Sequence, residues 1–301
     1  MSLFIRPYVL VWVLLILTAC QTGTPEPEAE VIGPPSTDIW LFSISPDGIE
    51  LQVRVTDLEG YDNQPMFSPN GGSLLFSSDR TGKTHTYRYD IESRALTQLT
   101  FGDAETFSPT PIPGTNGEQF SVVYADSLVY QGLWRYTLGG SLEPSPIVTV
   151  DAVAYYTWIG AEEVLFFRLG TPNSLQLINV ATADTRVLAE GSVLSLHPIP
   201  GEAASAYIFQ DSHDTPQIMR YDWLNRESTM LAPSIEGGKY FCVAPDGRLL
   251  MLDGGKLMAF TPGASVDWIE LADLGLSGGT RLAVSPDGTL LAVVGERIAN
   301  E

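Results

Sequence analysis

Residues 61–80 read Tyr-Asp-Asn-Gln-Pro-Met-Phe-Ser-Pro-Asn-Gly-Gly-Ser-Leu-Leu-Phe-Ser-Ser-Asp-Arg, and this stretch decides the fold. A first strand ends in a proline-containing turn at 69–71, and a second, apolar strand follows at 74–77. Asn-Gly and Asp-Gly pairs favour tight hairpins because the turn needs positive φ. Five degraded copies follow at spacings of 40 to 47 residues, with their turns at Pro113, Gly160, Pro200, Pro245 and Pro286. A repeat of this length built from short strands is typical of a β-propeller blade.

Each of the first five copies predicts four strands, for example 74–77, 86–90 and 95–99 after the first strand of the first copy, and 147–150 as the last strand of the second copy. The sixth copy has only two strands before the chain ends, whereas two strands at 38–42 and 50–55 belong to no copy. We therefore expect an all-β, six-bladed propeller with four-stranded blades, in which the N-terminal strands complete the last blade. Such closure protects strand edges that would otherwise be exposed.

The chain opens with an apolar run at 8–17 that is too short to span a bilayer as a permanent helix. The run ends in Leu17-Thr18-Ala19-Cys20, which suits a signal peptide of residues 1–19 cut between Ala19 and Cys20. This segment resembles a bacterial lipobox, and the resemblance implies that Cys20 carries acyl chains such as palmitate. Several chains on one residue give stable anchoring to a lipid bilayer. Gln21 follows the cysteine, which by the same resemblance implies the outer membrane of a Gram-negative cell, facing the periplasm.

Residues 20–37 follow as a polar tether rich in proline, glutamate and threonine, without an apolar period. Residues 38–301 then form one domain, because no second linker interrupts them. The net charge of −20 disfavours a nucleic-acid partner, since phosphate binding needs basic patches. It fits a soluble, self-repelling periplasmic body, for which we expect a monomer.

Residues 61–100 and 280–294 resemble the repeat of TolB-like propellers, with a Phe-Ser-Pro-Asn-Gly turn, a Ser-Asp-Arg segment and a closing Leu-Thr. Asn70 stands where that family has Asp, and the middle copies have lost the turn motif. TolB has an additional N-terminal α/β domain that this sequence does not show. The resemblance implies a propeller lipoprotein, while a TolB role does not carry over.

A binding site in a propeller is expected on the axis, where polar groups from several blades converge. The residues five positions before each turn form one layer of polar and aromatic side chains: Gln64, Ser108, Tyr155, Ser195, Tyr240 and Arg281. Asn63 and His197 are expected to join this layer, and Glu105 to lie at a channel mouth. The layer suits an amide, sugar or carboxylate better than hydrolysis, because it has no paired carboxylates.

Residues outside this layer are expected to be structural. Cys242 is predicted to be a buried small hydrophobe, and His85 and His213 to be surface residues in equivalent turns. Gly275-Leu276-Ser277-Gly278-Gly279 matches a nucleophile-elbow pattern, but a strand follows it where a hydrolase needs a helix. No histidine stands in a zinc-like spacing, so neither a metal nor a cofactor is expected.

These features favour a non-enzymatic, membrane-anchored binding or scaffold module of the cell envelope. It would contact a protein partner through a propeller face or its channel. The alternative is a small-ligand receptor or a metal-dependent hydrolase that uses the channel, for which Glu105 and Asn63 are the candidate metal ligands. Fold alone does not decide between them.

Overall fold

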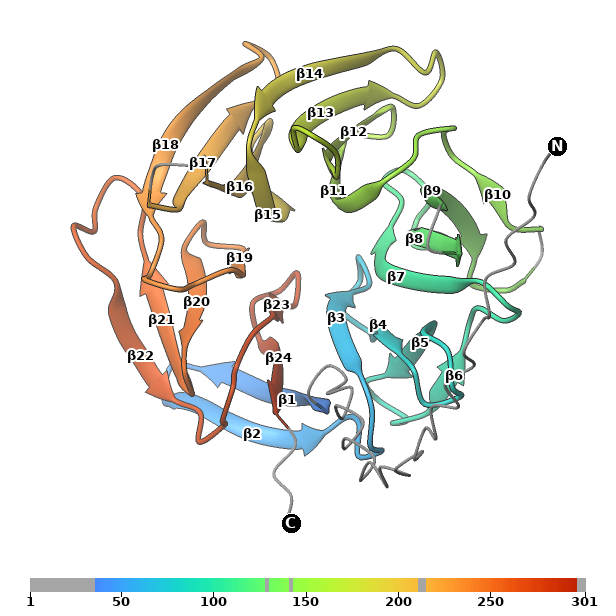
Figure 1. Ribbon diagram of the computed structural model, residues 1–301. Coiled ribbons are helices and arrows are strands. Elements are labelled where there is room, and N and C mark those ends of the chain that lie inside the picture. The colour runs from blue at the N-terminus through green and yellow to red at the C-terminus, as the bar shows by residue number, and fades with distance from the viewer. Residues whose placement is uncertain (1–35, 128–129, 141–142, 211–214, 297–301) are drawn as a thin grey trace, which may run out of the picture. The chain divides into compact units, whose positions relative to one another are not determined.

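The computed structural model describes residues 36–127, 130–140, 143–210 and 215–296. Ala19, Cys20, His213 and nearly all of the predicted tether lie outside the described residues. The described residues form 24 strands in six four-stranded antiparallel sheets. The sheets stand around a central axis as the blades of a propeller (Figure 1). The predicted fold class is therefore confirmed. Among the described residues no helix has the length and apolar character that a membrane crossing requires.

The chain builds blades 1 to 5 in order, from the axis outward. Blade 1 consists of β3 (Asp62–Phe67), β4 (Ser73–Ser78), β5 (His85–Asp90) and β6 (Leu96–Gln98), and blade 2 of β7 (Glu105–Pro111), β8 (Gln119–Ser127), β9 (Tyr130–Thr137) and β10 (Ser145–Pro146). Blade 3 consists of β11 (Val153–Ile159), β12 (Glu163–Arg168), β13 (Ser174–Asn179) and β14 (Thr185–Glu190), and blade 4 of β15 (Ser192–Pro198), β16 (Ala204–Gln210), β17 (Gln217–Asp222) and β18 (Glu227–Pro233). Blade 5 consists of β19 (Phe241–Val243), β20 (Leu249–Asp253), β21 (Lys256–Phe260) and β22 (Ile269–Asp273).

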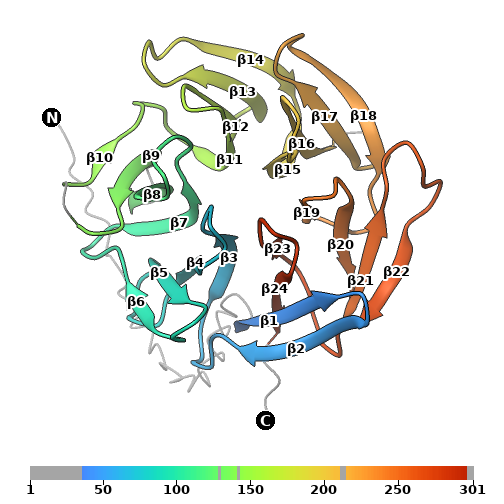
Figure 2. The same cartoon turned by 180° about the vertical axis from the view of Figure 1, so that it is seen from behind.

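Blade 6 joins the two ends of the described chain, as Figure 2 also shows. Its strand order is β2 (Gly48–Arg54), β1 (Thr37–Ser45), β24 (Leu290–Glu296) and β23 (Leu282–Val284). Strands β1 and β24 pair continuously from Thr37 opposite Glu296 to Ser43 opposite Leu290. The predicted closure by the N-terminal strands is confirmed, and the ladder leaves no open edge at the joint.

The hydrophobic core is divided among the interfaces between blades. Each of six buried clusters in the described chain joins two neighbouring blades. Leu41 of blade 6, for example, shares a cluster with Phe76 of blade 1, and both are buried. Burying these faces is the main stabilising contribution to the ring.

The turns after the inner strands pack against one another around the axis. Gly71 has φ of +71°, and a Cβ atom there would lie 3.7 Å from Cδ of Pro286 in the preceding blade. Gly117 has φ of +79°, and its Cβ would lie 3.4 Å from Cδ of Pro69. Glycine supplies the left-handed backbone that these turns need. The repeated proline-glycine turns are thus contacts between blades as well as hairpins.

Two details differ from the sequence-based expectations, and one is confirmed. The last strand of blade 2 is the short β10 at Ser145–Pro146, whereas Val148 is buried between blades 2 and 3. His85 is 5% exposed, so the prediction of a surface histidine is wrong. It begins β5 and lies in a buried threonine cluster, with Nδ1 3.5 Å from Oγ1 of Thr100. Cys242 is 3% exposed, as predicted.

Candidate functional site

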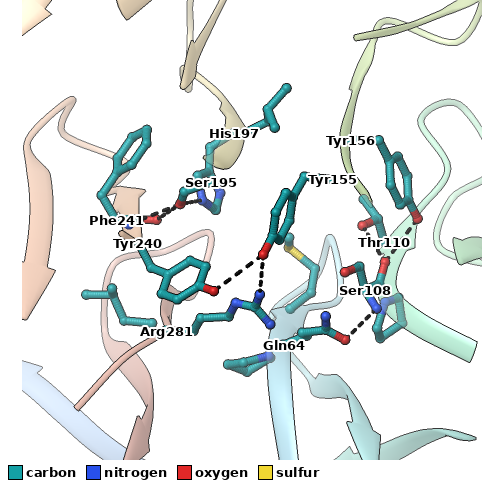
Figure 3. A pocket seen from close by; sticks show the side chains of 15 residues that line it. Gln64, Ser108, Thr110, Tyr155, Tyr156, Ser195, His197, Tyr240, Phe241 and Arg281 are labelled. Carbon is teal, nitrogen blue, oxygen red and sulfur yellow. Dashed lines mark hydrogen bonds between the residues drawn. The ribbon is translucent and has the colours of Figure 1, made fainter. Parts of the chain in front are cut away.

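A recess of about 80 Å³ with both polar and apolar lining lies on the axis, formed by residues at the innermost strands of all six blades (Figure 3). All six residues of the layer predicted from the repeat line it: Gln64, Ser108, Tyr155, Ser195, Tyr240 and Arg281. The alignment of the copies therefore located the recess correctly. That these residues bind a ligand stays a prediction.

Three of the inner strands bulge at this layer. Gln64, Ser108 and Ser195 have positive φ angles of 59°, 52° and 52°, a conformation that non-glycine residues rarely adopt. The ladder skips two residues at each of these places, for example between Asn63 and Met66. Pro65 and Pro109 follow two of the bulged residues, and proline has no N–H to donate to a ladder. The bulges bring three consecutive residues of each of these strands to the recess, against two from each of the others.

The Gln64 side chain connects blades 1 and 2 at the recess. Its Oε1 accepts hydrogen bonds from the Ser77 hydroxyl and from the Ser108 backbone N–H, both at 2.7 Å. Because Oε1 is occupied by two donors, the Nε2 amide group is held in a fixed orientation. Gln64 and Arg281 both line the recess (Figure 3), so an amide and a guanidinium contribute donors to the same small space.

Arg281 stands at the centre of the recess and contacts three other blades. It donates from one terminal nitrogen to Oδ1 of Asn63 at 3.2 Å and from the other to the Tyr155 hydroxyl at 3.3 Å. Its guanidinium carbon lies 4.3 Å from the centre of the Tyr240 ring and 5.6 Å from that of Tyr155. Both distances suit cation–π attraction. No carboxylate of the described residues forms an ion pair with Arg281.

Tyr155 and Tyr240 meet across the axis, with their hydroxyl oxygens 3.4 Å apart. Burial raises the pKa of Tyr155 to about 12, although the Arg281 charge acts in the opposite direction. Burial acts on Tyr240 in the same direction, but the Arg281 charge and the hydrogen bond with Tyr155 outweigh it, so the pKa of Tyr240 lies below its ordinary value. Arg281 donates to the Tyr155 oxygen, and either of the two hydroxyls can donate to the other, so the Tyr240 proton is available to a ligand when Tyr155 is the donor.

His197 lies on another side of the recess, and it is neutral at physiological pH. Its Nε2 is 3.0 Å from the Ser195 hydroxyl, which also bonds to both backbone groups of Phe241. Burial lowers the pKa of His197 to about 4, and the Arg281 charge adds to this effect. The ring also packs edge-on against Phe241, with ring centres 5.1 Å apart. His197 therefore adds polarity to the wall without adding charge.

Two predicted site residues lie beside the recess and do not line it. Asn63 is 8% exposed, and its Oδ1 accepts from both Arg281 and the Gln64 backbone N–H. It therefore positions Arg281. Glu105 begins β7, and its Oε1 accepts from the Thr84 backbone N–H of blade 1 at 3.1 Å. Glu105 thus connects two blades away from the recess, because its inner strand has not yet reached the layer of Ser108.

The structure adds two residues that the alignment did not select. The Tyr61 hydroxyl interacts with Arg281, and burial raises the pKa of Tyr61. Tyr156 is buried and donates toward the Ser108 carbonyl and the Ser121 hydroxyl, which ties blade 3 to blade 2. Tyr156 lies one position after the layer residue Tyr155, on a strand whose register shift, between Val153 and Tyr155, comes before the layer. The sequence signal for Tyr156 is a second aromatic residue directly after the layer residue, which a comparison of all copies reveals.

The described residues contain no group of three or more His, Cys, Asp or Glu side chains placed to hold a metal ion. A larger hollow of about 1210 Å³ lies at the opposite end of the inner strands, among the turns of blades 1 and 2. Its wall includes the half-buried Arg88 and Asp90 and the exposed Glu92, so charges of both signs line it. The axial recess is the place where donors converge around one uncompensated cation.

No protein-family model and no curated protein sequence matches this chain. Solved structures do. A protein assigned as TolB from Agrobacterium tumefaciens superposes with a TM-score of 0.70 at 15% identity, over 89% of this chain and 100% of that one. A gluconolactonase from Xanthomonas campestris reaches 0.61 at 13% identity, over 88% and 98%. TolB from Acinetobacter baumannii reaches 0.58 at 12% identity, over 87% of this chain and 64% of its own length. At these identities the likeness is one of fold.

Proposed function

We propose that this chain is a non-enzymatic binding module of the bacterial cell envelope, anchored through acylated Cys20 and contacting a protein partner at the axial recess. The observation that carries the proposal is the convergence of six blades on one recess that holds donors and a cation without a carboxylate partner. Convergent polar groups in a concave site are the usual features of a binding site. The likeness to TolB structures supports an envelope propeller of this kind.

The anchor and the location are parts of the same proposal. Ala19 and Cys20 mark the cut and the acylated residue, and Gln21 favours the outer membrane, with the domain facing the periplasm. The net charge of −20 favours a free, monomeric domain between contacts with its partner. Labelling cells with a palmitate analogue tests the anchor: we expect label on the wild-type protein and none on Cys20→Ala.

Crosslinking in native cells tests the partner. We expect one envelope protein to be captured by the wild-type protein and identified by mass spectrometry. The capture should weaken in Cys20→Ala, because the tether raises the local concentration of the domain at the membrane. Capture of the same protein at equal yield by both forms would contradict a tethered module. Absence of any captured protein would contradict the protein-binding function.

A second candidate function is a small-ligand receptor, and the dimensions of the recess favour it. A volume of about 80 Å³ admits a small molecule or one side chain, but not a folded surface. The hydrolase alternative gains its support from the likeness to a gluconolactonase, which is a likeness of fold. Metal analysis of purified protein tests that alternative, because a stoichiometric divalent ion on the axis would favour it over a non-enzymatic module.

A further inference from the structure

We propose that the axial recess is a carboxylate-binding site in which Arg281 is the counter-ion and Tyr240 and Gln64 supply neighbouring donors. This inference rests on the proposed function in using the same recess, and it names the chemistry of the group that enters. The group is either a free small carboxylate or a carboxylate at the end or side chain of a partner peptide.

The first argument is the state of the Arg281 charge. The guanidinium contacts neutral groups, namely the Asn63 amide oxygen and three tyrosines. A recessed cation with no carboxylate beside it favours an anion from solution, because charge-assisted hydrogen bonds are stronger inside a low-dielectric site. The guanidinium has five N–H donors. Contacts with Asn63, Tyr155 and Tyr61 use at most three, so at least two remain for a ligand.

The second argument concerns the hydrogen-bonding capacity that remains on the side chains next to Arg281. Both oxygen acceptors around Arg281 are already occupied, because Asn63 Oδ1 receives two donors and Gln64 Oε1 receives two others. What these side chains can still offer is N–H. The Tyr240 hydroxyl can accept from Tyr155 and turn its own proton toward a ligand. The unused capacity at the centre of the recess is therefore donor capacity, which suits an acceptor-only anion.

The third argument selects a carboxylate over a phosphate. One guanidinium balances one negative charge, and its planar fork matches the two oxygens of a carboxylate. A dianionic phosphate would add a second charge that no further cation of the recess lining balances, since Arg281 is its sole Arg or Lys among the described residues. The net charge of −20 opposes a dianion further. The aromatic rings at 4.3 and 5.6 Å also suit the apolar part of an organic acid.

Ligand-observed saturation-transfer NMR on the detergent-solubilised full-length protein tests the inference. The probes are acetate, methyl phosphate, acetyl-trialanine with a free C-terminus, the same peptide as its C-terminal amide, and acetyl-Ala-Glu-Ala-amide. We expect saturation to pass from the protein to the protons of the three carboxylates, and not to those of methyl phosphate or of the neutral peptide amide. Transfer to acetate alone would indicate a small free acid, and transfer to either peptide acid would indicate a partner segment.

Variants locate the binding. Arg281→Met should weaken carboxylate binding at least about tenfold, because it removes the charge and the donor fork. Arg281→Lys keeps the charge and should lose part of the affinity, and it also serves if the Met variant does not fold. Arg248→Met is the matched control: this arginine pairs with Asp246 at a turn, away from the recess, and its loss should change nothing.

Equal binding by wild type and Arg281→Met, or equal binding of the free peptide acid and its amide, would overturn the inference. Preferential transfer of saturation to methyl phosphate would overturn it as well. These outcomes are separable from those of the proposed function. Carboxylate binding without a captured partner would support the carboxylate site and contradict the protein-binding function. A captured partner without any carboxylate preference would support the protein-binding function and contradict the carboxylate site.

Discussion

The guanidinium carbon of Arg281 lies 4.3 Å from the centre of the Tyr240 ring, and the pKa of Tyr240 lies below that of an ordinary phenol. The contact explains the lowered pKa, because a nearby cation stabilises the phenolate form of Tyr240. Arg281 comes from the entry to β23 in blade 6, whereas Tyr240 directly precedes β19 in blade 5. The electrostatics of the recess are therefore a property of the assembled ring.

Removing the cation should reverse the shift of Tyr240. In Arg281→Met the burial of Tyr240 persists without the opposing charge, so we expect its pKa to rise above the ordinary value. Spectrophotometric titration of tyrosinate absorbance measures this, with Tyr240→Phe in each background to identify the Tyr240 signal. Arg248→Met should leave the titration unchanged. An unaltered Tyr240 titration in Arg281→Met would contradict the contact.

Substitution of two leucines of blade 6 tests the closure of the ring. Leu41 on β1 is 3% exposed and lies in the core between blades 6 and 1, whereas Leu51 on β2 is 53% exposed. Leu41→Ala should lower the free energy of unfolding by about 2–5 kcal/mol, since a buried leucine leaves a cavity. Leu51→Ala should change it by less than about 0.5 kcal/mol. Urea denaturation measures both, and equal effects would contradict closure by β1.

His197 should make the folded state sensitive to acid. Its pKa is about 4 in the fold, so the unfolded chain, with an ordinary pKa near 6.5, binds more protons between these values. Stability should therefore fall as pH decreases from about 6.5 to 4, by up to about 1.4 kcal/mol per pH unit. His85, whose pKa burial also lowers, acts in the same direction. Denaturation curves for His197→Asn should show a smaller slope in this window, and an unchanged slope would show that His197 is charged or exposed in the fold.

The Cys242 thiol should be inert in the folded protein. It is 3% exposed, and burial raises its pKa, so little thiolate exists to react. A thiol reagent such as dithionitrobenzoate should label it only after guanidinium is added. Cys242→Ala supplies the blank for any other thiol. Rapid labelling without denaturant would contradict the packing of β19 against its neighbours.

The repeat predicted the ring because its signal is carried by turns and alternating strands that each blade needs locally. Aligning the turns also selected the six lining residues, since equivalent positions lie at equal depth along the axis. The alignment did not reveal the bulges at Gln64, Ser108 and Ser195, which depend on how each inner strand pairs. Glu105 does not line the recess, because it lies three residues before Ser108 on β7 and its carboxylate bonds to the Thr84 backbone N–H. The burial of His85 depends on Thr100 and Thr106, which only the folded blades bring together.

Site-specific photocrosslinking in native cells tests most directly whether the axial recess contacts the partner. A photoreactive amino acid at Met66, which lines the recess, should capture the envelope partner. The same group at Asn70, an exposed residue of the turn after β3 that does not line the recess, should not. Arg281→Met should abolish the capture from Met66, and Arg248→Met should leave it intact. Capture from Asn70 alone, or capture from Met66 that survives Arg281→Met, would contradict recognition through the Arg281 recess.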